Sequence, residues 1–264
     1  MLTKSQYTMK HFFALLVLCA IVVACKTEPK ATTETKTDDE WISLFDGVST
    51  DGWRAYNGEG LPPGWVAKDG ELTFDTELGL EQDYTGGQDI IYGLEEFDNF
   101  EFYVEWKLPP GGNSGIFYHL KEGYGGPPDV SPEYQLIDDE NYAKMHDLTE
   151  YNTGLGYSNP SELQPLQQTA ADYAMHPADD AVKVLHPTGE WNSTRIIFTP
   201  EKVEHWLNGI KVVSFVPWSE DWNEKKMAGK WKDTPDYGKF KTGYIGFQDH
   251  SSPIWFRNIK IKKL

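Results

Sequence analysis

The clearest alternation of apolar and polar side chains runs from residue 99 to residue 108. Its apolar members are Phe100, Phe102, Val104 and Trp106, and polar or charged side chains separate them. Because successive side chains of a strand point to opposite faces, this period of two predicts a strand with one buried face. We expect further strands at Trp41–Phe45, Val66–Phe74, Asp89–Tyr92, Ser114–Leu120, Pro132–Asp139, Arg195–Thr199, Val203–Leu207, Ile210–Phe215, Tyr244–Asp249 and Ile254–Lys262.

Turn signals separate these strands at short intervals. Asp69-Gly70 and Asn208-Gly209 are two-residue sequences typical of tight β-hairpins. No helical period runs long enough to predict a long helix. The pattern therefore predicts an all-β fold, an antiparallel β-sandwich. Two long segments, 139–187 and 217–239, interrupt it, and their many aromatic residues favour ordered walls around a binding face over disorder.

The strand at 132–139 carries the strongest candidate chemistry. Its alternation places Glu133, Gln135 and Ile137 on one face and Tyr134 and Leu136 on the other. A carboxylate and a carboxamide two residues apart point into the same space, which suits a sugar with several hydroxyl groups. An ordinary solvated sheet face is the alternative interpretation, since antiparallel sheets often keep one face in water.

The first 40 residues are expected to lie outside the fold. Lys4 and Lys10 precede an apolar run, Phe12 to Ala24, which is too short to span a bilayer and is typical of a signal peptide at 1–24. Val22-Val23-Ala24-Cys25 resembles a bacterial lipobox, which implies lipidation of Cys25 and a membrane anchor there. Residues 25–40 are then a lipidated cysteine and a flexible polar tether. We expect a lipid-anchored protein of the bacterial cell envelope, located in the outer membrane. The alternative to lipidation is ordinary cleavage of the signal peptide.

Composition narrows the remaining choices. Both cysteines, Cys19 and Cys25, fall before the domain at 41–264, so no disulfide is expected in the fold. The formal net charge is −17, and removal of Lys4 and Lys10 with the signal peptide takes it to −19. Such a surface repels phosphate backbones, which argues against nucleic acid as a partner. Ten tryptophans are many for this length and indicate both core positions and stacking platforms.

An ordered set of local motifs from Trp41 to Lys262 resembles the bacterial 3-keto-disaccharide hydrolase family, whose fold is a concanavalin-A-like jelly-roll sandwich. The motifs are Ser43–Gly47 followed by Gly52-Trp53, Pro110–Ile116, Glu133–Asp138, Pro187–Asn192, His205–Gly209, and Gly243–His250 running into Phe256–Lys260. Each motif alone is weak, but their common order is specific. The resemblance implies an enzyme that cleaves glycosides carrying a ketone at C3.

A C3 ketone acidifies the hydrogen on C2, so a base can remove it and the glycosidic oxygen on C1 can leave by elimination, with water adding afterwards. Such a site needs a base, donors for the enolate oxygen and an acid for the leaving group. We expect Glu133 and His250 to transfer protons. The substrate-binding candidates are Lys107, Asn113, Tyr118, Gln135, Trp53, Trp206, Gln248 and Asp249.

Several alternatives stay open at the level of sequence. Asn113 also suits a turn, and Lys107 a solvated strand edge. No histidine pair has a metal-ligand spacing, yet a divalent ion held by distant residues is possible, and no cofactor is firmly expected. A laminarinase-type β-glucanase needs a carboxylate pair for which Glu133 and Asp138 would serve only with a bulge between them. A non-catalytic carbohydrate-binding lipoprotein is the other alternative.

Overall fold

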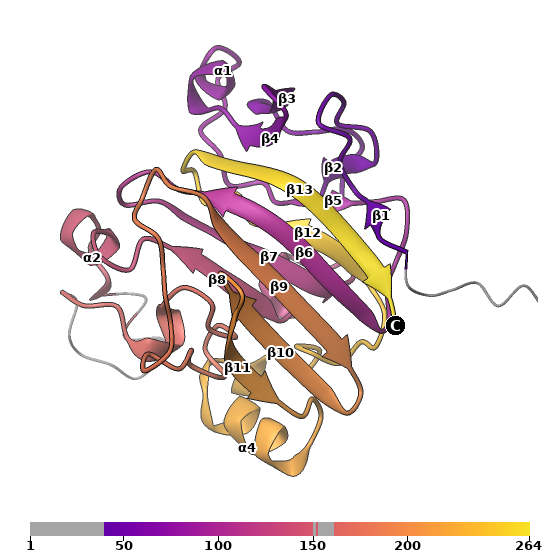
Figure 1. The fold of residues 1–264 in the computed structure, drawn as a ribbon, viewed down its shortest axis with the longest axis vertical. Helices are drawn as coiled ribbons and strands as arrows, with labels where there is room; N and C mark the ends of the chain where they lie inside the picture. The colour runs from indigo at the N-terminus through magenta and orange to yellow at the C-terminus, as the bar shows by residue number, and fades with distance from the viewer. Residues whose placement is uncertain (1–39, 150–151, 153–160) are drawn as a thin grey trace, which may run out of the picture. The chain divides into compact units, whose positions relative to one another are not determined.

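Two antiparallel sheets form the fold of the part of the chain that the computed structural model describes, residues 40–149, 152 and 161–264. The larger sheet has the strand order β11-β10-β9-β6-β13-β4-β3, with β1 also paired to β13, and the smaller has the order β2-β5-β12-β7-β8 (Figure 1). The strands are β1 Ile42–Ser43, β2 Trp53–Ala55, β3 Trp65–Lys68, β4 Glu71–Phe74, β5 Ile90–Tyr92, β6 Phe100–Lys107, β7 Asn113–Leu120, β8 Glu133–Ile137, β9 Asn192–Thr199, β10 Lys202–Leu207, β11 Ile210–Phe215, β12 Tyr244–Phe247 and β13 Ile254–Lys263.

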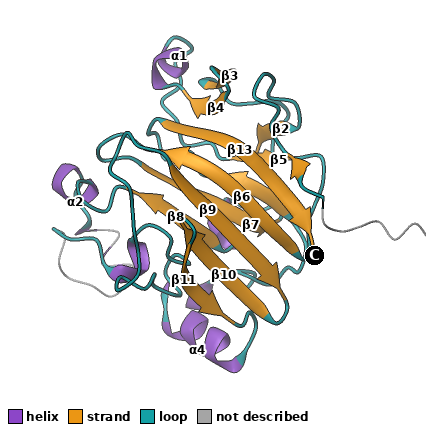
Figure 2. Cartoon of the chain, in the orientation of Figure 1, coloured by secondary structure: helices purple, strands orange, loops and turns teal. Residues whose placement is uncertain are grey.

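The helices are short and lie at the margins of the sheets (Figure 2). They are α1 Thr76–Leu80, α2 Tyr142–Met145 and α4 Glu220–Ala228, with 3₁₀ turns at Pro127–Asp129, Pro165–Gln167 and Lys230–Asp233. No helix of the described residues is long and apolar enough to cross a membrane. The all-β sandwich expected from the pattern is therefore confirmed. The expected signal peptide, Cys25 and the tether up to residue 39 lie outside the described residues.

The strand pattern follows the sequence closely. Along β6 every second side chain is buried, as its alternation predicts. The Asp69-Gly70 and Asn208-Gly209 turns have positive φ at both positions, 55° and 83° in the first and 48° and 81° in the second. Two positive φ values are what a type I′ hairpin requires, and Asn, Asp and Gly tolerate them best.

The core lies between the sheets and is rich in aromatic side chains. Phe247 of the smaller sheet stacks on Phe256 of the larger one, with ring centroids 3.8 Å apart, and on Trp53 at 4.8 Å. Tyr134 and Leu136 of β8 also point into this core. Because a strand alternates its faces, Glu133, Gln135 and Ile137 are left on the outer face of the smaller sheet, as expected.

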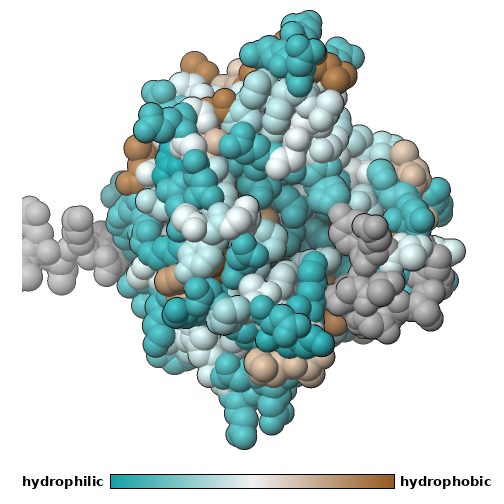
Figure 3. All heavy atoms as spheres, turned by 180° about the vertical axis from the view of Figure 1, so that it is seen from behind, coloured by the Kyte–Doolittle hydropathy of each residue, from teal (hydrophilic) through white to brown (hydrophobic). Residues whose placement is uncertain are grey.

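The two long segments cover the β8 side of that outer face. Residues 170–176 extend the sheet beyond β8: Tyr173 N donates to Glu133 O at 2.9 Å, and Gln135 N donates to Ala171 O at 3.1 Å. The second segment packs on the first, since Trp231 Nε1 donates a hydrogen bond to Tyr173 O at 3.3 Å. Within the second segment, the Trp231 ring stacks on that of Tyr237, with ring centroids 4.3 Å apart. Seen from behind, this side of the molecule is mostly hydrophilic and hollowed near its middle (Figure 3).

Candidate active site

The centre of the candidate site is a carboxyl group lying over a glycine. Glu133 of β8 pairs with Phe117 of β7, and Gly115, two residues back along β7, pairs with Gln135. A Cβ atom at Gly115 would lie only 2.2 Å from Glu133 Oε1. Because Gly115 has no side chain, the Glu133 carboxyl group extends inward over the sheet.

Glu133 is almost completely buried, and the other residues of the site determine its charge. Its side chain is 4 % exposed, and Oε1 has no hydrogen-bond partner among the described residues. Burial is the main cause that raises the pKa of Glu133 to about 8; Lys230 opposes this shift, and the negative charges of Asp89 and Asp172 add to it. A buried acceptor without a partner is costly to keep and often marks a functional group. Glu133 therefore has the properties of a strong base held in a protected position.

A cation approaches Glu133 from the wall beyond β8. Lys230 begins the 3₁₀ turn Lys230–Asp233, and its ammonium group donates to Tyr173 Oη at 3.2 Å. The same ammonium lies 4.5 Å from the Tyr173 ring centre and 4.9 Å from that of Trp231. Burial lowers the pKa of Lys230, while the charge of Glu133 raises it. Lys230 and Glu133 thus form a partly desolvated pair of opposite charge at the edge of the face.

On the other side of Gly115 lies a second carboxyl group. Gln248 N donates to Gly115 O at 2.9 Å, and the β5–β12 register, Ile90 opposite Phe247, continues to place Gln248 opposite Asp89. Asp89 and Gln248 therefore share one row across the outer face with Gly115 and Gln135. Burial is the main cause that raises the pKa of Asp89 to about 7; the hydrogen bond from Asp249 N opposes this shift, and the negative charge of Asp249 adds to it. The face therefore carries two carboxyl groups whose pKa values lie well above those of ordinary carboxyl groups.

One end of the same face holds Asn113 and His250. Asn113 Nδ2 donates to Tyr142 Oη at 3.3 Å, while the buried Asn113 Oδ1 has no partner among the described residues. The imidazole of His146 stacks on Tyr142 at 4.3 Å. Burial and the neighbouring His146 lower the pKa of His250 below its ordinary value of 6.5, so this imidazole is neutral at physiological pH. A neutral His250 is a weak proton donor.

Five binding candidates do not join this face, and these expectations are wrong. Tyr118 and Trp53 are buried in the inter-sheet core. Lys107 and Trp206 lie on the outer face of the larger sheet: Lys107 Nζ is 4.7 Å from the Trp191 ring centre and 4.9 Å from that of Trp255, and Trp206 Nε1 donates to Glu204. Asp249 is buried, and its Oδ2 accepts from Tyr84 Oη at 2.7 Å and Trp65 Nε1 at 3.3 Å.

These misplacements share a physical cause. Trp53 and Tyr118 occupy alternating strand positions, so a sequence shows only that they lie on one face or the other. Which face is buried depends on the sheet that packs against it, and that sheet consists of segments distant in the sequence. Glu133, Gln135, Gln248, Asn113 and His250 fall at the outer face of the smaller sheet or at its end.

The sequence reasoning missed three residues of the site. Asp89 directly precedes the short strand β5, and this position two residues before Ile91 is the local sign that the two share a face. Gly115 and Lys230 gave no usable signal. The role of Gly115 depends on the side chain of the neighbouring strand, and Lys230 lies in an irregular segment.

The described residues show no cluster of side chains suited to bind a metal ion. Within residues 40–149, 152 and 161–264, no group of three or more His, Cys, Asp or Glu side chains is arranged to hold an ion.

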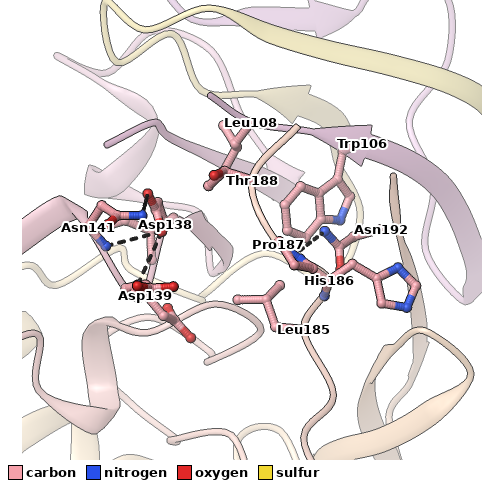
Figure 4. Close-up of a pocket in the computed structure, with 12 residues that line it drawn as sticks. Trp106, Leu108, Asp138, Asp139, Asn141, Leu185, His186, Pro187, Thr188 and Asn192 are labelled. Atoms are coloured by element: carbon pink, nitrogen blue, oxygen red, sulfur yellow. Dashed lines mark hydrogen bonds between the residues drawn. The ribbon is translucent and has the colours of Figure 1, made fainter. Parts of the chain in front are cut away.

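A separate cavity of about 230 Å³ lies at the edge of the sandwich, where β8 ends (Figure 4). Its polar side chains already have partners. Asp138 Oδ2 accepts from Gly111 N and Asn141 Nδ2, both at 2.8 Å, and Asn192 Oδ1 accepts from His186 N at 2.9 Å. None of the residues that carry the chemistry described above lines this cavity. It is therefore not the candidate active site.

The sandwich and its buried carboxyl group are the features of a glycoside-cleaving enzyme, and the comparisons with known proteins agree. The model of a family described as the 3-keto-α-glucoside-1,2-lyase-like domain matches residues 40–262. The chain belongs to this family and is a glycoside hydrolase-like enzyme.

Individual relatives agree with the family assignment. The chain is 32 % identical over 246 residues to a 3-keto-disaccharide hydrolase of Bacteroides thetaiotaomicron, covering 86 % of this chain and 79 % of the relative. A crystal structure of a candidate glycosyl hydrolase from Parabacteroides distasonis is 38 % identical, with a TM-score of 0.71, over 85 % of this chain and 94 % of that one. A second such structure from the same organism is 25 % identical, with a TM-score of 0.60, over 86 % and 100 %.

Proposed function

We propose that the protein cleaves glycosides that carry a ketone at C3, by proton abstraction at C2 and elimination of the glycosidic oxygen from C1, followed by addition of water. The observation that carries this proposal is the Glu133 carboxyl group, which is buried, has no hydrogen-bond partner at Oε1 and has a raised pKa. The relative named as a 3-keto-disaccharide hydrolase supports the substrate class.

The C2 proton of a 3-keto sugar is a weak acid, so its removal needs a strong base. A carboxylate surrounded by water is too weakly basic for this task, whereas burial strengthens a carboxylate as a base. In this proposal Glu133 takes the C2 proton and the electron pair moves onto the C3 oxygen. The enolate then expels the C1 oxygen to give a C1–C2 double bond. Water adds to C1, and Glu133 returns the proton to C2.

The developing enolate oxygen needs a positive group beside the base. Lys230 is a neighbouring cation that interacts with Glu133, and Tyr173 holds its ammonium group at 3.2 Å. A preorganised cation in a site with little water stabilises such an oxyanion more than an exposed one does. Gln135, Gln248 and Asn113 are proposed to bind sugar hydroxyl groups, and His250 lies at the end of the face beside them.

The site offers little support for the Glu133–Asp138 carboxylate pair of the glucanase alternative. That mechanism needs two carboxyl groups facing one glycosidic bond. Asp138, the expected partner of Glu133, accepts hydrogen bonds from the backbone of Gly111, Glu140 and Asn141 and so anchors a turn. The family assignment favours an enzyme over a non-catalytic sugar-binding protein. We also propose that Cys25 carries a lipid and anchors the enzyme in a bacterial cell envelope.

The test compares a 3-keto-disaccharide with its unoxidised parent, using wild type and Glu133→Gln, with and without a chelator. We expect release of sugar from the keto form alone, and exchange of the C2 hydrogen for deuterium in D₂O that Glu133→Gln abolishes. Cleavage of the unoxidised parent would contradict the proposal, as would exchange that persists in Glu133→Gln. Loss of turnover on chelation, restored by a divalent ion, would assign the stabilisation of the enolate to a metal in place of Lys230.

A further inference from the structure

We propose that Asp89 is the acid that protonates the departing glycosidic oxygen. This inference rests on the proposed function and adds a catalytic residue to it. From the sequence, Glu133 and His250 were expected to transfer protons. Asp89 is a second carboxyl group on the outer face of the smaller sheet, and its charge raises the pKa of Glu133.

The first argument is the order of groups across the face. Lys230 lies beyond β8, Glu133 lies over Gly115 of β7, and Asp89 lies at the start of β5. The substrate has the same order: ketone oxygen on C3, acidic hydrogen on C2, leaving oxygen on C1. With the ketone at Lys230 and C2 at Glu133, the C1 oxygen points toward Asp89. Binding in the opposite direction would place the enolate oxygen beside a carboxyl group.

The second argument is the space between the two carboxyl groups. Strands in a sheet are about 4.8 Å apart, so β7 and β5, with β12 between them, are separated by roughly 9–10 Å. Glu133 occupies the space over β7, and the Asp89 side chain shortens the remaining gap. In this proposal the sugar ring lies between the base on one side and the acid on the other. Gln248 lies on β12 between them and is placed to bind a hydroxyl group.

The third argument is the environment of Asp89. Its Oδ1 accepts a hydrogen bond from Asp249 N at 2.9 Å, and Oδ2 makes no hydrogen bond with any described residue. Besides burial, the negative charge of Asp249 raises the pKa of Asp89, and the charge of Asp89 in turn raises the pKa of Tyr84 and of Glu133. A buried carboxyl group beside a negative charge keeps its proton at higher pH than an ordinary aspartate. His250 is neutral and faces a second imidazole, His146.

Protons are conserved over elimination and hydration. As the C1–O bond breaks, its electron pair stays on the leaving oxygen, which takes the proton of Asp89. In the hydration that follows, water attacks C1 and gives a proton to the Asp89 carboxylate, while Glu133 returns its proton to C2. Both carboxyl groups end in their starting states, and no further reactant besides water is needed.

The test uses two substrates, a 3-keto-disaccharide and a 4-nitrophenyl 3-keto-glucoside, whose leaving group needs no protonation. For Asp89→Asn we expect kcat/KM to fall about 100-fold or more on the disaccharide, as loss of a general acid does, and to stay within about threefold on the aryl glycoside. Deuterium exchange at C2 should persist, and formate should restore part of the disaccharide activity of Asp89→Ala. Thermal unfolding of both variants checks that they fold.

The outcomes separate this inference from the proposed function. If Asp89→Asn loses activity equally on both substrates, or keeps full activity on the disaccharide, the role of Asp89 is overturned. Deuterium exchange at C2 that depends on Glu133 would still support elimination in that case. Exchange lost in Asp89→Asn and kept in Glu133→Gln would reverse the two roles and overturn the assignment. No exchange in wild type would contradict the proposed function itself.

Discussion

The carboxyl group of Glu133 occupies the space that a side chain at Gly115 would fill: a Cβ atom there would lie 2.2 Å from Glu133 Oε1. The two residues lie on neighbouring strands, and the backbone hydrogen bonds of β7 and β8 fix their relative positions. A buried carboxyl group is thereby held over the sheet with one oxygen that has no hydrogen-bond partner among the described residues.

Gly115→Ala should displace this carboxyl group. We expect kcat/KM to fall about 100-fold or more, because a misplaced base loses most of its catalytic effect. Gly126→Ala is the matched control, since Gly126 has extended backbone and a Cβ there would meet Pro128 at an ordinary 3.5 Å. Kinetics and thermal unfolding of both variants provide the measurement. Full activity in Gly115→Ala would show that Glu133 does not need this position.

Glu133 should make the stability of the protein depend on pH. Its pKa is about 8 in the folded chain against an ordinary value of 4.5, so between these values the folded state holds a proton that the unfolded state lacks. The free energy of unfolding therefore falls as pH rises through this window. Glutamine cannot ionise, so the Tm of Glu133→Gln minus that of wild type should become more positive from pH 5 to pH 8. A constant difference would mean that Glu133 ionises normally.

Lys230→Met should alter the pH dependence of catalysis. Lys230 lowers the pKa of Glu133, so its removal should shift the acidic limb of the kcat/KM profile upward by about one unit. Loss of the enolate-stabilising charge should also reduce kcat by roughly 100-fold. Lys225→Met is the control, because Lys225 lies on α4 and pairs with the exposed Asp221. An unshifted limb would separate Lys230 from Glu133.

Lys107→Ala and Trp206→Ala should leave turnover within about twofold of wild type, since both residues lie outside the machinery of general acid–base catalysis. Removing the ammonium of Lys107 from between Trp191 and Trp255 should lower the free energy of unfolding by about 1 kcal/mol. Activity assays and chemical denaturation test the pair. A large loss of kcat in either variant would require a second site on the larger sheet.

Cys25→Ala tests the proposed anchor. Lipidation needs the thiol of this residue, so the variant should lose incorporation of a labelled fatty acid and move from the membrane fraction to the soluble fraction of expressing bacteria. The substitution should leave kcat/KM unchanged, because residue 25 precedes the catalytic domain in the sequence. Membrane association that survives the substitution would contradict the lipid anchor.

The secondary structure was predictable because it depends on local rules. Alternation along β6 and the Asp69-Gly70 and Asn208-Gly209 turns fixed the strand and hairpin type without knowledge of any partner. The prediction was less accurate where hydrogen-bond pairing with a neighbouring strand determines the ends of a strand. The strand expected from Arg195 begins at Asn192, and the strand expected to reach Asp249 ends at Phe247. β2 was not expected as a strand because its three residues acquire this state by pairing with β5.

The sequence by itself determined the all-β class, the face that Glu133 and Gln135 share, and the motif order that identifies the family. These depend on strand periodicity and on residues close together in the chain. Only the tertiary structure decided which aromatic residues are core and which groups surround Glu133. Gly115, Asp89 and Lys230 come from three separate segments, and strand register and wall packing bring them to one carboxyl group. Burial and charge proximity are properties of that assembly, so the raised pKa of Glu133 cannot be read from any local pattern.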